Sequence, residues 1–528
     1  MKGKPALRAA ALIVTLSSIT GLTVAQTPIY TVDEDSTYMI NDDLDLSTVL
    51  PGLPDVVEVD GVISTSHIAA PAQIPLNRLH GGKGPCDVNF DSGCDSYDRL
   101  RPGQSLDRDS NFHRLGRVAG RPSSKHGCDS SICDCSKWIK RAPLPLLRGG
   151  GWVQGGITYN SLRPANPAGP GGLGIGNLPV GFNYRSDNFQ LNQVYAYLEN
   201  PAETGGCGCD VGFRADFLYG EDYYFVEALG LERHQDGSEK WNGDRNGNGL
   251  RNLTNTGNTT QTGTALPQAY GEIAYNNVKL RAGHFYTTIG YESVMARDNF
   301  FYSHAYTMQF GEPFTHTGAL AMVGDDDVGF SIHGGIHTGW DVWWREGIGA
   351  NHYGFLGGLK YTTYNQAFTL AATVTTGDEP DATAAGFSTR TLYSVVAQAQ
   401  LLQSVRAIVQ HDWGIQINGV APGQNAEWYG LNSYLLLDLT QKTSAGIRYE
   451  WFNDQNGFRI AGAGSNYYEI TAGLNCRPNP FFVIRPEVRW DWQDFHTTAG
   501  PVPVFDINDP TGPNSSQFTA AVDVIFKY

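Results

Sequence analysis

The sequence contains no hydrophobic run long enough for a membrane-spanning helix. Beyond its first 25 residues, no segment approaches the roughly 18 consecutive apolar residues that such a helix needs. Methionine is rare, with 5 in 528 residues, and only 17% of residues are charged, which argues against a helical cytosolic protein. The mean hydropathy of -0.30 suits a soluble protein or a membrane β-barrel equally, because only every second residue of a spanning strand faces lipid.

Signatures of common enzymes and metal sites are also missing from the sequence. It contains no G-x-S-x-G, H-E-x-x-H or Walker motif. Residues 244–249 resemble the start of a calcium-binding loop, but Asn255 stands where a bidentate Glu is needed. A flexible loop is therefore favoured over a metal site, and neither a cofactor nor a metal is expected.

Positive charge is scarce, with 37 Lys and Arg against 53 Asp and Glu, so nucleic acid is not an expected partner. Part of that positive charge lies at the start, where Lys2, Lys4 and Arg8 precede an apolar stretch over 9–22. Small residues at 23–25 complete the pattern of a secretory signal peptide, which predicts cleavage after Ala25. Removing the three basic residues would take the net charge from -16 to -19.

Residues 26–148 show no sustained period of 2 or 3.6 and are rich in Pro, Gly, Asp and Ser. They are predicted to form a largely irregular periplasmic extension of the exported chain. Cysteines in an exported protein suggest disulfides. Disulfides between cysteines of the extension and cysteines of the following domain could hold the extension beneath that domain. Zinc is the weaker alternative, because the spacings match no standard finger. The candidate disulfide cysteines are Cys86, Cys94, Cys128, Cys133, Cys135, Cys207, Cys209 and Cys476.

From residue 149 to 528 the side chains alternate between apolar and polar, as in half-buried strands. In one such stretch the apolar face reads Phe482, Ile484, Pro486, Val488, Trp490, Trp492, and the other face reads Val483, Arg485, Glu487, Arg489, Asp491, Gln493. Aromatic residues are abundant, with 26 Tyr, 24 Phe and 11 Trp, which favours strands and membrane-interface belts.

Connection lengths separate a membrane barrel from a soluble sandwich. About sixteen strand-like segments are joined alternately by short turns, such as 276–277 and 403–404, and by long polar links. The long links include 220–267, 287–315, 377–390 and 493–515. Short periplasmic turns and long outer loops are typical of an outer-membrane barrel. The fold class predicted is all-β: a transmembrane antiparallel β-barrel of about 16 strands, wide enough for an aqueous channel.

Several blocks of the sequence resemble the OmpL-like β-barrel porins of bacterial outer membranes. They include residues 189–195, 283–292, 298–304, 310–318, 426–432, 448–452 and 466–469, and together they span about 150–528. The resemblance implies a porin-like barrel but no particular solute, and nothing carries over to the cysteine-rich stretch before 148. Large porins often fold their third long loop into the lumen as a constriction, and some sixteen-strand porins form trimers, so a homotrimer is a hypothesis by analogy.

Two groups of charged residues are candidates for lining the channel. The link 287–315 is the third long loop, and its constriction candidates are Glu292, Arg297, Asp298, His304, Gln309 and Glu312; the alternative is an ordinary external loop. The strand candidates lie opposite apolar neighbours and must face the lumen, since charge facing lipid costs a few kcal/mol. They are Arg214, Arg281, Arg406, Arg448, Glu450, Arg485, Glu487, Arg489 and Asp491, which could also brace the wall as ion pairs.

Together these patterns predict an outer-membrane porin that passes small polar or charged solutes by diffusion, and not an enzyme. Its expected partners are outer-membrane lipid, the solutes or ions themselves, and the barrel-assembly machinery, which reads a terminal aromatic such as Tyr528. Two alternatives remain open at this stage. One is an exported all-β protein that binds or degrades carbohydrate, and the other is an outer-membrane barrel enzyme.

Overall fold

The computed structural model describes residues 147–166, 176–204, 208–242, 262–324, 327–383, 386–460, 464–496, 503–505 and 514–528. The predicted signal peptide, almost all of the predicted extension and the calcium-like stretch at 244–255 lie outside these residues. All described residues belong to one compact unit, Tyr97–Tyr528.

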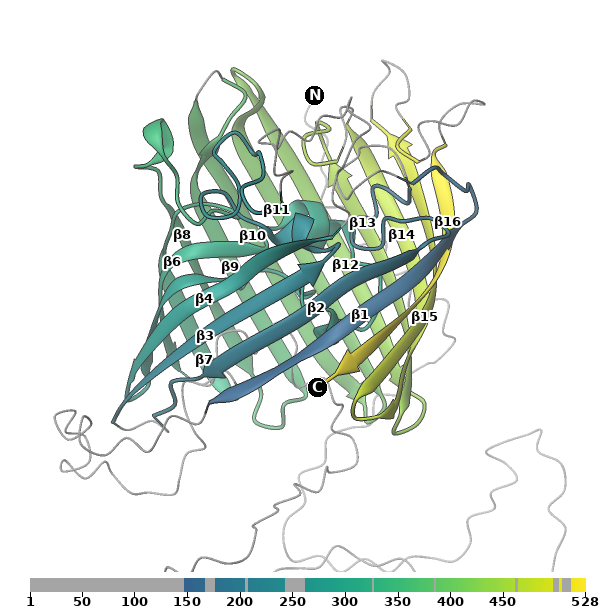
Figure 1. Ribbon diagram of the computed structural model, residues 1–528, viewed down its shortest axis with the longest axis horizontal. Coiled ribbons are helices and arrows are strands. Elements are labelled where there is room, and N and C mark those ends of the chain that lie inside the picture. The colour runs from purple at the N-terminus through teal and green to yellow at the C-terminus, as the bar shows by residue number, and fades with distance from the viewer. Residues whose placement is uncertain are drawn as a thin grey trace, which may run out of the picture. The chain divides into compact units, whose positions relative to one another are not determined.

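Sixteen antiparallel strands of the described chain close into a barrel, because the first strand pairs with the last (Figure 1). All other neighbouring pairs are sequential, so the chain winds once around the wall in an up-and-down meander. The strands are β1 Arg148–Asn160, β2 Phe189–Asn200, β3 Cys209–Gly220, β4 Gly263–Tyr275, β5 Val278–Tyr286, β6 Thr315–Gly324, β7 Gly329–His337, β8 Gly354–Thr362, β9 Phe368–Pro380, β10 Phe387–Leu402, β11 Val405–Ala421, β12 Gln424–Asp438, β13 Thr443–Asp454, β14 Ser465–Asn479, β15 Phe482–Phe495 and β16 Ser516–Lys527. The predicted strand number and barrel are confirmed.

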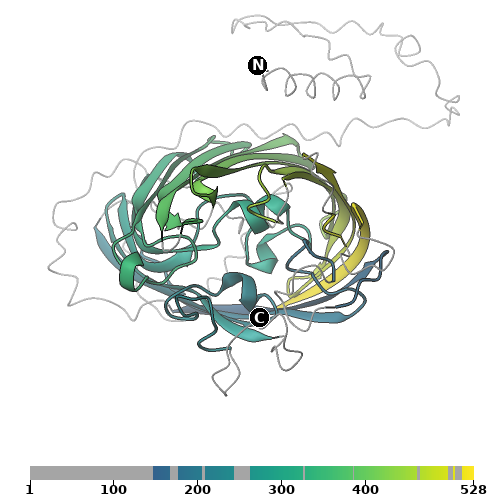
Figure 2. The same cartoon turned by 90° about the horizontal axis from the view of Figure 1, so that it is seen from above.

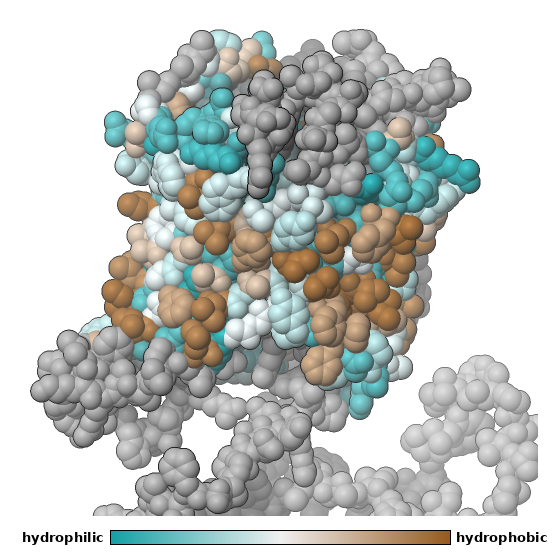
Figure 3. All heavy atoms as spheres, viewed as in Figure 1, coloured by the Kyte–Doolittle hydropathy of each residue, from teal (hydrophilic) through white to brown (hydrophobic). Residues whose placement is uncertain are grey.

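The barrel is inverted relative to a soluble protein, with its apolar side chains outside. On β15, Val488 and Trp490 are 44% and 50% exposed, whereas the charged residues between and beside them are buried. Figure 3 shows apolar side chains gathered over the middle and lower part of one outer face, below a more hydrophilic upper part. Strands with this alternation suit a barrel whose outer face contacts lipid and whose backbone groups pair around the ring.

Aromatic rings occupy matching positions on the outer face of neighbouring strands. Tyr393, Trp413 and Tyr429 occupy adjacent positions on three neighbouring strands, β10 to β12. On β14 and β15, the rings of Tyr468 and Trp492 stack with their centroids 5.2 Å apart. Rings with a polar edge are favoured where hydrocarbon meets water, so their place on the outer face suits a barrel in contact with a membrane.

The two rims of the barrel differ in their connections. At the rim that holds the start of β1 and the end of β16, here the turn rim, the links are two to eight residues long. The opposite rim, here the loop rim, carries the long links at the top of Figure 1, including 221–262 and 287–314. The predicted long link at 377–390 is wrong: β9 and β10 continue through most of it, leaving 381–386. Their Thr-rich ends pair across the strands, and Thr376 and Thr391 share a hydrogen bond of 2.8 Å between hydroxyl oxygens.

The helical elements in the described part are single turns in the loops. They are α2 Tyr223–Val226, η4 Ala296–Asp298, η5 Thr307–Gly311 and η6 Gly347–Gly349. Within the described ranges, no helix has the length and apolar character required to cross a membrane.

Two cysteines lie in the described part of the chain. Cys209, the first residue of β3, is disulfide-bonded. Cys476 is a free thiol, so the disulfide hypothesis is wrong for this residue in the structure. It lies on β14 opposite Thr443 and Ile484, in step with Leu474, and therefore belongs to the outer face of the wall. The other six candidate cysteines lie outside the described residues.

Candidate channel constriction

The third long loop, residues 287–314 and here called L3, folds into the barrel. Figure 2 shows its short helical segments inside the ring of strands. Residues of L3 form hydrogen bonds with inner-face side chains of β11, β12, β13, β14 and β15. Because L3 leaves β5 and returns to β6, these bonds carry it from one side of the barrel to the wall on the other.

Carboxylates of the wall bind the backbone of L3. Glu450 on β13 accepts the backbone N–H groups of Tyr306 at 2.5 Å and Thr307 at 2.6 Å. Glu487 on β15 accepts those of Tyr302 at 2.8 Å and Ser303 at 3.0 Å. A buried backbone N–H group without a hydrogen-bond partner is costly. L3 forms little regular structure of its own, so these wall carboxylates supply the acceptors that a helix or sheet would otherwise provide.

Arginines of the wall bind the carbonyl groups of the same loop. Arg485 donates from one terminal nitrogen to the carbonyl oxygens of Ala296 and Asn299, each at 2.9 Å. Arg489 donates to the carbonyl oxygen of His304 at 2.7 Å. The alternating Arg and carboxylate residues of β15 therefore match the alternating acceptors and donors of L3.

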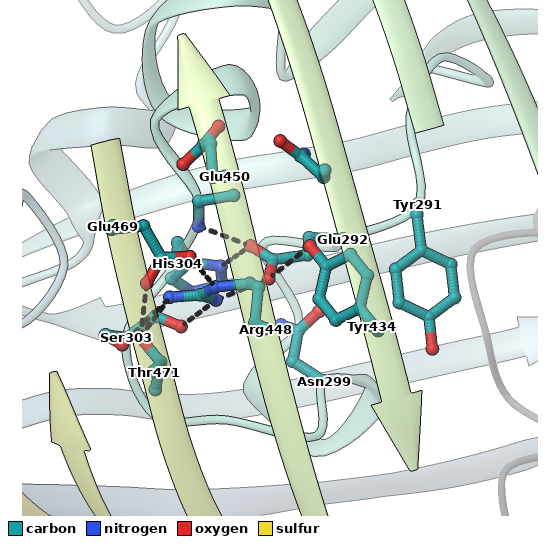
Figure 4. Close-up of polar contacts among 12 residues, drawn as sticks. Tyr291, Glu292, Asn299, Ser303, His304, Tyr434, Arg448, Glu450, Glu469 and Thr471 are labelled. Carbon is teal, nitrogen blue, oxygen red and sulfur yellow. Dashed lines mark hydrogen bonds and ion pairs between the residues drawn. The ribbon is translucent and has the colours of Figure 1, made fainter. Parts of the chain in front are cut away.

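Arg448 on β13 is the centre of a polar network that joins L3 to the wall (Figure 4). It contacts Glu292 of L3 at 2.7 Å and Glu469 of β14 at 2.5 Å, and it donates to the carbonyl oxygen of Ser303 at 2.8 Å. Tyr434 also donates its hydroxyl to Glu292 at 3.0 Å. The network fixes Glu292 and Ser303 of L3 to β12, β13 and β14 at once.

Burial by itself would raise the pKa of Glu292. The charge of Arg448, the contact with His304 and the hydrogen bond from the backbone of Ala305 together outweigh burial and hold the pKa of Glu292 at about 2. Glu292 is therefore ionised at neutral pH, as its contact with Arg448 requires.

Glycines on the inner wall make room for L3. A Cβ atom on Gly430 of β12 would lie 2.3 Å from Oγ1 of Thr307, in η5. A Cβ on Gly446 of β13 would lie 2.4 Å from the ring of Phe300. Neither contact is tolerable without displacing the loop, so these two glycines set how closely L3 packs on the wall.

The structure changes the role expected for most of the predicted wall residues. None of the following is more than 5% exposed: Arg448, Glu450, Arg485, Glu487, Arg489 and Asp491. The prediction that they line the water-filled passage is wrong in the structure, because L3 covers them. Arg281, 2% exposed, is likewise buried and pairs with Glu272 at 2.8 Å. The alternative that such residues brace the wall fits them instead.

The remaining candidates are less enclosed or belong to L3 itself. Arg214 and Arg406 are partly exposed, and Arg214 pairs with Asp216 at 2.7 Å. Arg297 of L3 is partly exposed, pairs with Asp298 at 3.3 Å and lies over the ring of Trp152 at 5.0 Å. Three others within L3 are turned towards the protein: Glu292, His304 and Glu312 are 6%, 4% and 5% exposed.

Sequence reasoning missed several residues that hold L3. Gln410 on β11 donates to Glu312 and accepts from the backbone of Tyr291 at 2.9 Å. Trp428 on β12 donates its indole N–H to the carbonyl oxygen of Gly311 at 3.1 Å, and Asn475 on β14 donates to that of Phe300 at 3.1 Å. In the sequence, only the alternation pattern marks these residues, because it places them on the inner face. Many other uncharged residues have the same position, so the pattern does not single these three out.

The sequence matches the model of a family described as "Putative beta-barrel porin-2, OmpL-like" over residues 147–528. No curated protein matches it. Among solved structures, it is similar to the outer membrane channel DcaP of Acinetobacter baumannii, with 10% identity, 72% of this chain and 97% of the other covered, and a TM-score of 0.45.

It is also similar to an anion-selective porin from Comamonas acidovorans, at 10% identity, covering 72% and 99% of the two chains with a TM-score of 0.43. The trimer form of OmpT from Vibrio cholerae gives 8% identity, the same coverages and a TM-score of 0.42. The family match covers the whole barrel described above. The chain belongs to the OmpL-like β-barrel porins, and its barrel is a porin channel of the outer-membrane type.

Proposed function

We propose that the protein is a passive channel whose passage is narrowed by L3, and that it admits small polar or charged solutes. The observation that carries this proposal is the anchoring of L3 across the barrel by wall carboxylates and arginines, because a loop fixed in this way narrows the lumen without gating by large motion. Solutes would pass beside L3, past partly exposed side chains such as Arg214, Arg297 and Arg406. Charges at such positions would set the ion preference.

We infer that the barrel has no catalytic role. Its buried acidic and basic groups in L3 and the facing wall are engaged with one another and with the backbone, as at Glu450 and Arg489, so they serve to hold the loop. An outer-membrane barrel enzyme would instead need a nucleophile and a base converging on an accessible site. Hydrolysis of ester, peptide or glycosidic model substrates by the purified protein would overturn this inference.

The remaining expectations concern export and assembly. We propose that residues 1–25 direct export and are removed, that 26–148 form a periplasmic extension, and that the assembly machinery recognises β16 together with Tyr528, which follows it. N-terminal sequencing of the mature protein tests the first point, with Gln26 expected as its first residue. A homotrimer is the oligomer proposed, and light scattering in detergent with a monomeric mass would refute it.

Single-channel recording in planar bilayers tests the channel itself. The detergent-purified protein should give stepwise, ohmic conductance in KCl, and reversal potentials in a salt gradient should report its ion preference. A variant that lacks residues 291–311, with the ends of L3 joined, should conduct several-fold better if L3 is the narrowest point. Insertion without conductance in both proteins would refute a channel, and equal conductance of the two would refute the constriction.

A further inference from the structure

Two arginines at the loop rim differ from the wall arginines described above, because no carboxylate forms an ion pair with them in the described part of the chain. Arg390, the fourth residue of β10, lies on the inner face of that strand, and Arg459 lies in the loop 455–464. Arg390 donates its Nε–H to Gln416 at 2.6 Å, and Arg459 donates its Nε–H to the carbonyl oxygen of Phe310. Both are partly exposed, and neither forms an ion pair with any residue that the structure describes.

Aromatic rings hold the two guanidinium groups close together. The guanidinium carbon of Arg390 lies 4.8 Å from the ring centroid of Trp340 and 5.8 Å from that of Phe458. The guanidinium carbon of Arg459 lies 5.6 and 5.7 Å from the same two rings, and 5.1 Å from that of Trp428. A guanidinium group held against ring faces is stabilised by the rings without using up its N–H groups, which can still donate to a ligand.

The carboxylates nearest to this pair are engaged by other donors. Glu379 pairs with Arg345 at 2.6 Å and accepts the backbone N–H of Trp340 at 2.8 Å. Asp454 accepts three successive backbone N–H groups, from 458 to 460, at 2.8 to 2.9 Å. Asp341 accepts the backbone N–H groups of Phe314 at 3.0 Å and of Thr315 at 2.8 Å.

The charge of the pair is therefore only partly compensated. Burial and the neighbouring charge of Arg390 lower the pKa of Arg459 to about 9, which still leaves it protonated at neutral pH. Two protonated guanidinium groups at close range repel each other, and a bound anion between or beside them would remove that repulsion. Arginine forks match the planar oxygens of carboxylate and the oxygens of phosphate.

We propose that Arg390 and Arg459 form a binding site for a small oxyanion, a carboxylate or a phosphate, at the loop-rim mouth of the channel. The proposal rests on the proposed function, because the site would collect its ligand from solution before the ligand reaches L3. Arg459 contacts the carbonyl of Phe310 in L3, so the site adjoins the constriction on the loop-rim side. An anion held there would be concentrated at the entrance and would also slow the passage of other ions.

The test compares block of the KCl current by added anions. Sodium benzoate and inorganic phosphate are titrated on the loop-rim side, with neutral benzamide as the control for the aromatic body. Wild type should show saturable block by at least one anion and none by benzamide. Arg390→Gln and Arg459→Gln should each weaken the anion affinity about tenfold, as expected for loss of a charge-assisted hydrogen bond. Arg148→Gln, which alters an exposed arginine on β1, should leave it unchanged.

Isothermal titration of the same anions into detergent-solubilised protein keeps the test independent of conductance. Absence of block and of binding heat in wild type, or equal affinities in wild type and both Gln variants, would overturn the site. A changed KCl conductance with unchanged anion affinity would identify the arginines as braces for L3 and would also overturn it. Benzoate and phosphate titrations distinguish the two ligand sources. If wild type gives no KCl current at all, the proposed channel function fails, while the titration still decides the site.

Discussion

Replacing Arg448 by Met should loosen L3 from the wall, because Arg448 is the cation shared by two buried carboxylates. The substitution removes the hydrogen bonds to Glu292, to Glu469 and to Ser303 while keeping a side chain of similar length. Removing one partner of a buried ion pair costs about 3–5 kcal/mol. Glu469 keeps Arg489 at 3.9 Å, so we expect the lower figure, about 3 kcal/mol, which comes mainly from Glu292.

A loss of about 3 kcal/mol makes the detached form of this part of L3 about a hundredfold more populated. Single-channel recordings of Arg448→Met should therefore show larger and noisier conductance than wild type. In detergent, the variant should begin to unfold at a lower denaturant concentration than wild type. Arg148→Met, at an exposed position, is the control and should change stability by less than about 0.5 kcal/mol. In the double variant with Glu292→Gln, the two effects should fall short of additivity by about 1–3 kcal/mol. Wild-type conductance and stability in Arg448→Met would refute the assignment of this residue as an anchor.

Three further outcomes are expected. The pKa of Glu292 is held at about 2, below its ordinary value of 4.5, so its contribution to stability is complete above pH 4.5 and is lost as the pH falls towards 2. Conductance should therefore stay constant between about pH 7 and 5 and increase only below about pH 5. A pH series in which Glu292→Gln shows the same acid transition would contradict this. Gly430→Val should displace η5 and cost about 1–3 kcal/mol, measured by denaturant unfolding, whereas Gly271→Val, on the open outer face of β4, should cost much less. Val522→Arg, in the middle of the lipid-facing side of β16, should cost about 2–4 kcal/mol in refolding into liposomes, and Phe518→Arg, nearer the rim, should cost less.

Alternation of side chains and the pattern of connection lengths together predicted the barrel but not what fills it. The period of two at Arg485, Glu487 and Arg489 correctly assigns these residues to the inner face. It does not tell whether water or protein lies against them, since that depends on a loop nearly 200 residues earlier in the chain. L3 itself carries little regular pattern, because its polar groups are satisfied by the wall and not by its own periodic structure.

Strand ends and the outer cysteine show the same limit. The stretch 377–390 contains Gly, Asp, Pro and Thr, which are typical of loops, yet pairing between β9 and β10 continues across most of it. Cys476 was predicted as a disulfide partner because the chain is predicted to be exported, but strand parity directs it outward with Leu474. Propensity and position along the chain were weaker guides at these sites than the register of neighbouring strands.

The anchoring of L3 has a consequence for the order in which the protein assembles. Bonds from L3 to β12 and β15 join residues 117 to 189 positions apart, and the groups that receive the loop are presented by strands made late in synthesis. The receiving wall is incomplete until β13, β14 and β15 are paired, so until then the loop has nowhere to place its amides and carbonyls. We therefore expect docking of L3 to be a late and slow step, which narrows the wide lumen of a barrel whose strands have already paired into a closed ring.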